Sequence, residues 1–198
     1  MRVVVQEFLT LDGVMQAPGG SDEDLEDGFE HGGWQMDFDS DAASDGTIAE
    51  WESKVEALLL GRKTYQIWEG AWGVWPEDAP GLMGEFTRRY NRVTKYVASR
   101  TAPNLSWKNS QLLGPDLRSE VAALRAQPGG EIRVWGSSVL IRSLAEQDLV
   151  DEYRLLIYPI ILGTGKKLFP DGFPASRLKL ISSRPLASGV VINIYERR

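Results

Sequence analysis

LLLGRKTYQIW, residues 58–68, is the stretch from which the fold of this chain can be worked out. Its three leucines are typical of a buried strand, Gly61 ends the apolar run, and the residues that follow have helical character. A strand that ends in glycine and leads into a helix is a good anion site, because free backbone N–H groups and the helix dipole both favour phosphate. Arg62 and Lys63 add positive potential.

The same alternation of short apolar runs and helical patterns continues on both sides of this stretch. It predicts an α/β fold with a mostly parallel sheet, helices on both faces and antiparallel strands at the C-terminal end. No linker or repeat divides the chain, so residues 1–198 form one predicted domain. The expected strands are 3–8, 57–60, 95–98, 132–135 and 150–162 (broken near Pro159), the helices are 44–57, 82–92, 116–127 and 137–146, and a hairpin joins 178–185 to 190–195.

Composition excludes several classes of function. The chain has 198 residues, 42% hydrophobic and 25% charged, as is ordinary for a globular protein. It has no cysteine and a single histidine, His31, which argues against disulfides, thiolate chemistry, a zinc cluster and a Ser-His-Asp triad. A carboxylate metal site stays open as the alternative, but no metal is expected. No apolar run approaches the roughly 20 residues of a membrane span, and the N-terminus does not fit a signal peptide. We therefore expect a soluble cytoplasmic protein with no membrane partner.

Charge is distributed unevenly along the chain. Residues 1–52 hold 14 acidic residues and one basic residue, whereas residues 53–198 hold 14 acidic and 21 basic residues. One interpretation is a solvated acidic loop on an ordinary surface; the other is a basic portion that hosts a polyanionic ligand. The basic residues are scattered and match no nucleic-acid module, so a nucleic-acid partner is not expected. The acidic, glycine-rich stretch inside residues 13–45, called the flap below, is either a functional flap or partly disordered.

Two later strand ends resemble the first. Ser99, Arg100 and Thr101 follow a strand, and an arginine fork flanked by hydroxyls suits the 2′-phosphate of NADP, although a plain strand exit with a surface arginine is the simpler alternative. Gly136 and Ser137 open another helix, where the alternative is helix capping by Ser137 or Ser138. Because ligands gather at the carboxyl ends of parallel strands, three such ends together favour a ligand site.

Other candidates have a structural and a functional interpretation. The run 163–167, GTGKK, lacks the spacing of a P-loop or a dinucleotide fingerprint and is interpreted as a cationic turn, with a direct ligand contact as the alternative. Asp12 either makes a turn with Gly13 or places a carboxylate beside a substrate. Asp45 and Glu50, on or near the first helix, are either solvated acids or further site carboxylates. The dense tryptophans either pack the core or wall a flat heterocycle; they are Trp34, Trp68, Trp72 and Trp75.

In this order, LLLGRKTYQIW, KYVASRT and RVWGSSVLIRSL resemble segments of the dihydrofolate reductase-like fold. The chain is most similar to the reductase domain of the riboflavin-biosynthesis deaminase-reductases and their stand-alone relatives. The opening QEFLTLDGVM and the closing LVDEYRLLIYPIILGTGKKLF also resemble that branch. The resemblance runs from about Arg2 to the C-terminus and implies a three-layer fold. No deaminase zinc signature is present, so only the reductase half is expected.

The resemblance also implies roles for residues. Asp12 would face the substrate pocket, and Asp45 lies as far before Gly61 as the folate-site carboxylate of dihydrofolate reductases lies before its glycine. The proton would then come from Asp12, from Asp45 or from water. At the cofactor phosphates the resemblance implies Gly61, Arg62, Lys63 and Thr64. At the 2′-phosphate it implies Ser99, Arg100 and Thr101. At the pyrophosphate and nicotinamide it implies Gly136, Ser137, Ser138, Val139 and Leu140.

The expected function is NADPH-dependent hydride transfer to a small heterocyclic substrate. A ribosylaminopyrimidine of the riboflavin pathway, 5-amino-6-(5-phosphoribosylamino)uracil, is the leading substrate by resemblance, and a pterin or folate is second. The alternative from another class is a dinucleotide-binding sensor without catalysis, since a fold alone does not establish chemistry. A homodimer that pairs through the sheet would be in keeping with the family.

Overall fold

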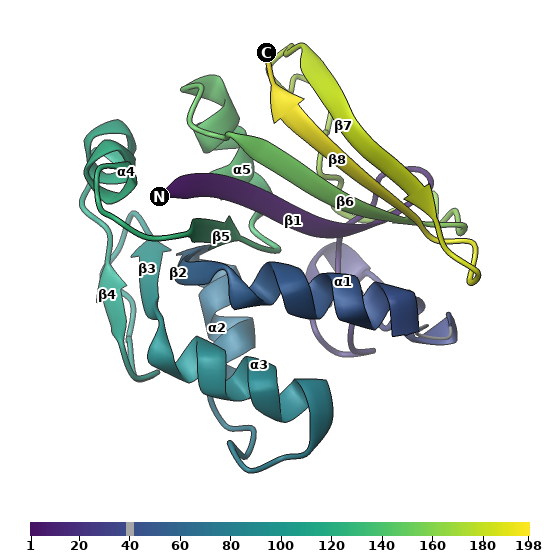
Figure 1. Ribbon diagram of the computed structural model, residues 1–198, viewed down its shortest axis with the longest axis horizontal. Helices are drawn as coiled ribbons and strands as arrows, with labels where there is room; N and C mark the ends of the chain where they lie inside the picture. The colour runs from purple at the N-terminus through teal and green to yellow at the C-terminus, as the bar shows by residue number, and fades with distance from the viewer. Residues whose placement is uncertain (39–41) are drawn as a thin grey trace.

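The computed structural model describes residues 1–38 and 42–198, and for residues 42–45 it describes the backbone alone. Within these ranges the chain forms one sheet with strand order β4-β3-β2-β5-β1-β6-β8-β7 (Figure 1). The strands are β1 (Arg2–Thr10), β2 (Val55–Gly61), β3 (Thr94–Ala98), β4 (Ser110–Leu112), β5 (Glu131–Val134), β6 (Glu152–Tyr158), β7 (Leu178–Pro185) and β8 (Val191–Arg197). The helices are α1 (Ala42–Ser53), α2 (Arg62–Ala71), α3 (Gly81–Arg92), α4 (Leu117–Arg125) and α5 (Ser138–Glu146), with short 3-10 turns η1 (Glu26–Gly28) and η2 (Trp34–Asp37).

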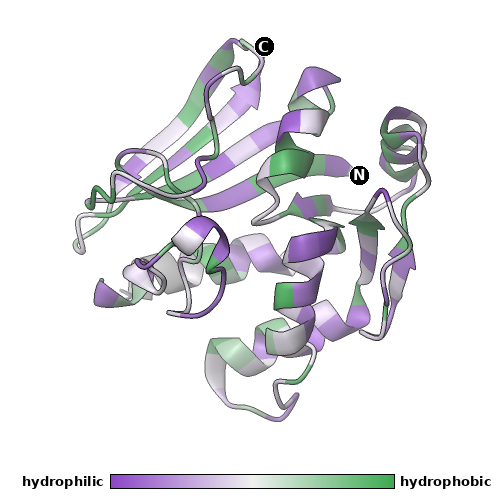
Figure 2. Cartoon of the chain, turned by 180° about the vertical axis from the view of Figure 1, so that it is seen from behind, coloured by the Kyte–Doolittle hydropathy of each residue, from purple (hydrophilic) through white to green (hydrophobic). Residues whose placement is uncertain are grey.

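The sheet is parallel from β4 to β6 and antiparallel beyond β6. The last strand, β8, returns between β6 and β7 and pairs antiparallel with both. Helices α1 and α3 lie in front of the sheet in Figure 1, and α5 comes to the front in the reverse view of Figure 2. The predicted three-layer α/β fold with a C-terminal antiparallel hairpin is therefore confirmed.

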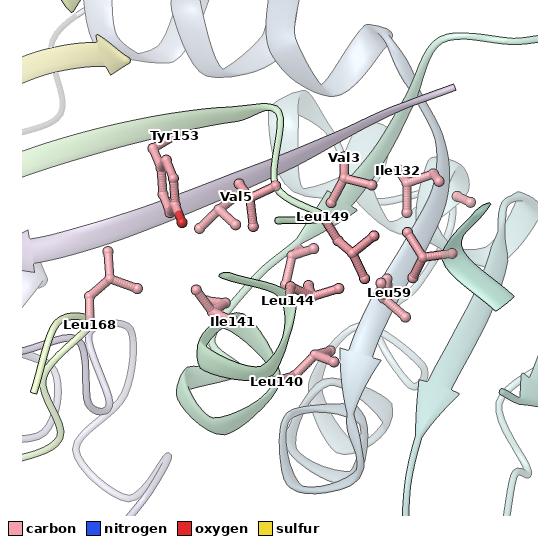
Figure 3. Packing of buried hydrophobic residues seen from close by; sticks show 14 of the residues in the cluster. Val3, Val5, Leu59, Ile132, Leu140, Ile141, Leu144, Leu149, Tyr153 and Leu168 are labelled. Carbon is pink, nitrogen blue, oxygen red and sulfur yellow. The ribbon is translucent and has the colours of Figure 1, made fainter. Parts of the chain in front are cut away.

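The main apolar core lies between the sheet and the helices α4 and α5. Alternate residues of β1, Val3 and Val5, point to this face and are fully buried. Figure 3 shows them beside Ile141 and Leu144 of α5. This is the period-two pattern of a strand meeting the apolar stripe of a helix, and it packs α5 against β1 and β5 on this face of the sheet.

The opposite face of the sheet carries a buried ionic network. The fully buried guanidinium of Arg133 on β5 lies 2.8 Å from a carboxylate oxygen of Glu52 on α1 and also pairs with Glu131. Glu131 in turn accepts from Arg154 on β6 at 2.6 Å, and Arg154 also pairs with Glu152. Buried charges are tolerated where each has such partners, so this network ties the end of α1 to strands β5 and β6.

One strand was missed. Residues 110–112 are absent from the strands expected from the sequence, but they form β4, which pairs in parallel with β3 from Lys95↔Ser110 to Val97↔Leu112. Its residues are half-buried or exposed at the sheet edge, so they carry no apolar signal. The break predicted near Pro159 in residues 150–162 is confirmed: β6 ends at Tyr158, because Pro159 has no N–H for the ladder. No helix in the described part of the chain is long and apolar enough to cross a membrane.

The described part of the flap, residues 13–38, is folded. The buried indole of Trp34 donates from Nε1 to the backbone oxygen of Gln16 at 2.8 Å. The amide of Gln16 donates to the backbone oxygens of Asp24 and Glu26, both at 3.1 Å. These contacts hold the acidic turn near η1 against the chain that leaves β1.

Candidate functional site

The three strand ends singled out in the sequence meet at the carboxyl edge of the parallel strands. Gly61, at the end of β2, is the ladder partner of Ala98 at the end of β3, which places Ser99 and Arg100 one strand away from it. The third end, after β5, is joined to Gly61 by a hydrogen bond: the Gly61 N–H donates to Ser137 Oγ at 2.9 Å. The prediction that these ends lie side by side is thus confirmed for the described residues.

A chain of hydroxyl groups fastens α2 to α5. Ser137 Oγ lies 3.0 Å from Thr64 Oγ1, and Thr64 Oγ1 donates to the backbone oxygen of Gly136 at 2.9 Å. Gly136 has φ +58°, and a Cβ built on it would lie 3.1 Å from Thr64 Cγ2. Both features favour glycine here, because a side chain would push the two helix starts apart.

Both helices begin at this point without a side-chain cap. The residue before α2 is Gly61, and the residue before α5 is Ser137, whose hydroxyl is used by Gly61 and Thr64 instead. The capping alternative for Ser137 is therefore not what the geometry shows. Two adjacent helix N-termini without side-chain caps concentrate free N–H groups and positive dipole ends, which is an arrangement suited to phosphate.

The other residues predicted at the cofactor differ in their surroundings. Arg62, Arg100 and Thr101 are exposed, and Ser99 Oγ accepts from the Thr101 N–H at 3.2 Å. On α5, Ser138 is half-buried, Val139 is 74% exposed and Leu140 packs into the main core. The loop after β3 is anchored to α2, because Glu69 accepts from the Trp107 N–H at 2.9 Å.

Lys63 contacts the flap. Its Nζ lies 3.2 Å from Asp24 and 2.5 Å from Glu26, and Lys166, in the loop after β6, lies 2.5 Å from each of the same carboxylates. We call these four residues the flap clamp. The two lysines hold the pKa of Glu26 below its usual value; burial opposes this for Asp24, but hydrogen bonds from Lys166 and Lys63 still leave its pKa lowered. Lys63, which the family resemblance implies at the cofactor phosphates, is thus paired with acids of the flap.

Asp12 is tied to the loop that follows β6. It accepts from Thr10 Oγ1 at 2.7 Å, from the Gly163 N–H at 2.9 Å and from the Leu162 N–H at 3.2 Å. Slight burial would raise the pKa of this carboxyl, but these hydrogen bonds outweigh it and leave the pKa lowered. An ionised, hydrogen-bonded Asp12 has a structural task here, and the geometry does not support it as a proton donor. The side chain of Asp45 lies outside the described residues.

Sequence reasoning missed Glu7. It is only 3% exposed, and its Oε1 accepts from the Gly136 N–H at 2.6 Å. Burial raises the pKa of this carboxyl well above its usual value; the Gly136 hydrogen bond opposes that shift, and the charge of Glu23 in the flap adds to it. An acid inside the apolar run VVVQEFL was the signal that could have identified it.

Aromatic side chains gather near the same edge, on the α1 side of the sheet. Tyr158, at the end of β6, has edge-to-face contacts with Phe8, Trp34 and Phe38, with ring centroids 5.3 to 5.8 Å apart. Phe8 also lies against Trp135, with centroids 5.2 Å apart. Of the other dense tryptophans, Trp68 and Trp72 pack around Tyr90, whereas Trp75 is 45% exposed.

A cavity of about 590 Å³ opens beside the flap. Its lining combines Gln16, Phe29 and Glu26 with Thr164, Lys166 and Lys167 of the GTGKK turn, among other residues. The volume falls in the range of small-molecule sites. A second hollow, of about 400 Å³, is lined by Arg2, Arg125 and Arg197, each paired with an acid. No cluster of side chains able to hold a metal ion occurs among the described residues.

Comparison with known proteins identifies the family. The model of the RibD C-terminal domain matches residues 1–192. The uncharacterized protein YyaP of Bacillus subtilis is 29% identical over 194 residues, which cover 98% of this chain and 94% of that protein. YwjB, another uncharacterized protein of Bacillus subtilis, is 21% identical over 192 residues, 97% of this chain and 96% of its own length.

Three solved structures have a similar fold. A candidate riboflavin biosynthesis protein from Shewanella sp. PV-4 superimposes with a TM-score of 0.74 and 20% identity, covering 100% of this chain and 99% of its own. A pyrimidine reductase-like protein from Corynebacterium diphtheriae superimposes with a TM-score of 0.64 and 14% identity, covering 100% of this chain and 92% of its own. Dihydrofolate reductase from Enterococcus faecalis, complexed with NADP(H) and RAB-propyl, superimposes with a TM-score of 0.59 and 13% identity, covering 100% of this chain and 96% of its own. The chain therefore belongs to the RibD C-terminal domain family and is a reductase-like domain of the dihydrofolate reductase-like fold.

Proposed function

We propose that this protein is an NADPH-dependent reductase that transfers a hydride to a small heterocyclic substrate. One observation carries the proposal: two helices start side by side without side-chain caps at the carboxyl edge, fastened by the Ser137–Thr64 contact of 3.0 Å. A pyrophosphate carries its charge on two neighbouring phosphates, and two neighbouring helix N-termini suit such a ligand. The fold shared with an NADP(H)-complexed dihydrofolate reductase supports this choice.

The roles of the residues follow from their positions. The first turns of α2 and α5 would bind the pyrophosphate through backbone N–H groups, and the exposed Arg100, one strand away, would bind the 2′-phosphate of the adenosine. Lys63 would reach a phosphate only after leaving Asp24 and Glu26. When bound, the cofactor supplies the hydride, and the chain orients the reactants and excludes water.

For the substrate we propose a flat heterocycle on the α1 side of the same edge. Phe8, Trp34 and Tyr158 pack together there; Trp34 and Tyr158 are buried, so the half-buried Phe8 is the ring that would contact a planar substrate. A ribosylaminopyrimidine is the leading candidate, supported by the family and by the pyrimidine reductase-like neighbour, and a pterin or folate is second. With Asp12 ionised, the proton would come from water or from Asp45.

The cofactor assignment is tested by titrating NADPH and NADH into the protein and into the Arg100→Ala variant, following tryptophan fluorescence. A charge-assisted hydrogen bond is worth roughly 1.5–3 kcal/mol, so NADPH should bind about 10- to 100-fold more weakly to the variant. NADH lacks the extra phosphate and should bind equally to both. Arg177→Ala, an exposed arginine preceding β7, is the control. Equal loss of both cofactors, or no loss of NADPH, would contradict the arginine's role.

A sensor without catalysis is the second candidate. It is favoured by the ionised state of Asp12, because this acid of the opening segment that resembles the family then has no proton to donate. The two are separated by mixing the protein with NADPH and a panel of pyrimidine and pterin substrates while following absorbance of the reduced nicotinamide. Consumption of NADPH with one of them identifies a reductase. Binding without consumption across the panel identifies the sensor.

A further inference from the structure

The inference concerns Glu7 and rests on the proposed function of the site around it. Strands β1 and β5 pair from Arg2↔Glu131 to Val5↔Val134 and then diverge. Beyond that point β1 continues along β6 to Thr10, whereas β5 ends and the chain turns into α5. Glu7 is the first residue after the divergence that points to the same face as Val5. Its carboxyl group bridges the opening by accepting from the Gly136 N–H.

This divergence lies where ligands bind in sheets of this kind. The chain leaving β1 leads to α1 on one face, and the chain leaving β5 leads to α5 on the other. In α/β sheets, ligands bind outside the carboxyl ends of strands whose connections go to opposite faces. Gly136 is exposed, and the Glu7 carboxyl is bonded directly to its backbone. Gly136 therefore connects Glu7 to both helix N-termini, because it lies just before α5 and its backbone oxygen accepts from Thr64 on α2.

The surroundings of Glu7 disfavour a negative charge. Its neighbours on the same face of β1, Val5 and Leu9, and its partner on β6, Leu155, are buried apolar residues. From β5 it receives only the Gly136 N–H, and from the flap it feels the like charge of Glu23. Within the described residues no cation pairs with it and no hydrogen bond reaches its second oxygen, Oε2. A buried carboxylate without a cation is costly, so the carboxyl keeps its proton.

We propose that Glu7 is a ligand-binding residue of the dinucleotide site, which as a neutral carboxylic acid donates its O–H to the bound anion and on ionisation repels it. One Glu7 oxygen fixes the Gly136 backbone between α2 and α5, and the other presents the proton. A carboxylate next to a phosphate would otherwise oppose binding by Coulomb repulsion, which is strong where water is excluded. Cofactor affinity is then linked to the protonation of one buried side chain.

The test measures NADPH binding to the wild type, Glu7→Gln and Glu23→Gln from neutral to alkaline pH. Wild-type affinity should be constant at neutral pH and should fall above an onset, by up to about tenfold per pH unit. Glu7→Gln keeps the acceptor for Gly136 and cannot ionise, so its affinity should not show that fall. Glu23→Gln removes the like charge that acts on Glu7, so the onset should move to lower pH. Parallel wild-type and Glu7→Gln profiles would overturn the proposal.

A second measurement is independent of NADPH. The infrared difference spectrum between wild type and Glu7→Gln at neutral pH should contain the carbonyl stretch of a protonated carboxylic acid; a carboxylate band there instead would overturn the inference even if NADPH binds. Conversely, if the wild type binds no dinucleotide at any pH while the acid band is present, the proposed cofactor function fails, and with it the ligand role of Glu7. Thermal unfolding of both variants shows whether each is folded.

Discussion

The most direct prediction concerns the hydrogen bond between Ser137 and Thr64, because this bond holds together the starts of α5 and α2, which form the proposed phosphate site. In Ser137→Ala the Gly61 N–H loses its acceptor at 2.9 Å, and the hydroxyl can no longer donate to Thr64 Oγ1 at 3.0 Å or to the Trp135 backbone oxygen at 2.9 Å. A hydroxyl has one proton, so it donates to one of these two oxygens at a time.

Two hydrogen bonds are therefore lost at once. At roughly 0.5–1.5 kcal/mol each, with the Gly61 amide left unpaired, we expect a loss of about 2 kcal/mol in the free energy of unfolding. For a domain of this size, that corresponds to a fall of about 4–8 °C in Tm. NADPH binding should weaken as well, since the starts of α2 and α5 are no longer held together.

The assay is thermal and urea unfolding of Ser137→Ala, Thr64→Val and the double variant. The double-mutant cycle isolates the side-chain contact, and contacting residues show coupling of about 0.5–3 kcal/mol. Ser138→Ala is the matched control, because Ser138 makes no hydrogen bond through its side chain among the described residues and should change stability by less than about 0.5 kcal/mol. If Ser137→Ala and Ser138→Ala unfold alike, the fastening does not exist and the argument for adjacent helix N-termini fails.

Two further predictions use other parts of the chain. Replacing both flap acids of the clamp, as Asp24→Asn with Glu26→Gln, should free Lys63 and Lys166 and strengthen NADPH binding at low salt. Asp22→Asn is the control, because Asp22 precedes the clamp acids in sequence and forms no ion pair with the residues that the structure describes. Unchanged affinity in the double variant would show that flap and cofactor do not compete. Burial lowers the pKa of Lys95 from 10.5 to about 8, so above about 8 the unfolded chain holds a proton that the folded chain has released. Stability relative to Lys95→Met should therefore rise with pH between these values, by at most about 1.4 kcal/mol per unit; urea unfolding at several pH values that gave a flat or falling difference would contradict this.

The parts of the site that were predictable from sequence depend on local signals. Gly61 and Ser137 lie where two apolar runs end, with Thr64 in the helix that follows Gly61, and parallel strands bring such ends to one edge, so their proximity could be inferred without coordinates. The fold followed from the same alternation. The edge strand β4 gave no such signal because its three residues are not alternately buried.

The remaining features depend on contacts between distant parts of the chain. The partners of Lys63 are flap acids almost 40 positions earlier, and local sequence does not indicate which of many carboxylates will reach it. Asp12 was interpreted through its neighbour Gly13, whereas two of its three hydrogen-bond donors, the Leu162 and Gly163 N–H groups, lie about 150 residues later. Glu7 lay in a run interpreted only as a buried strand, and its significance depends on the point at which β5 leaves β1.

The ionic network under α1 has a consequence for how the protein folds. Arg133 and Arg154 form buried ion pairs with acids on α1, β5 and β6. If any one of these elements were not in place, a charged side chain would be left unpaired in an apolar interior. Partly assembled sheets therefore have high free energy, and the central strands and α1 are required to form together. This half of the molecule should melt as one cooperative unit, with amide protons that exchange only through global unfolding.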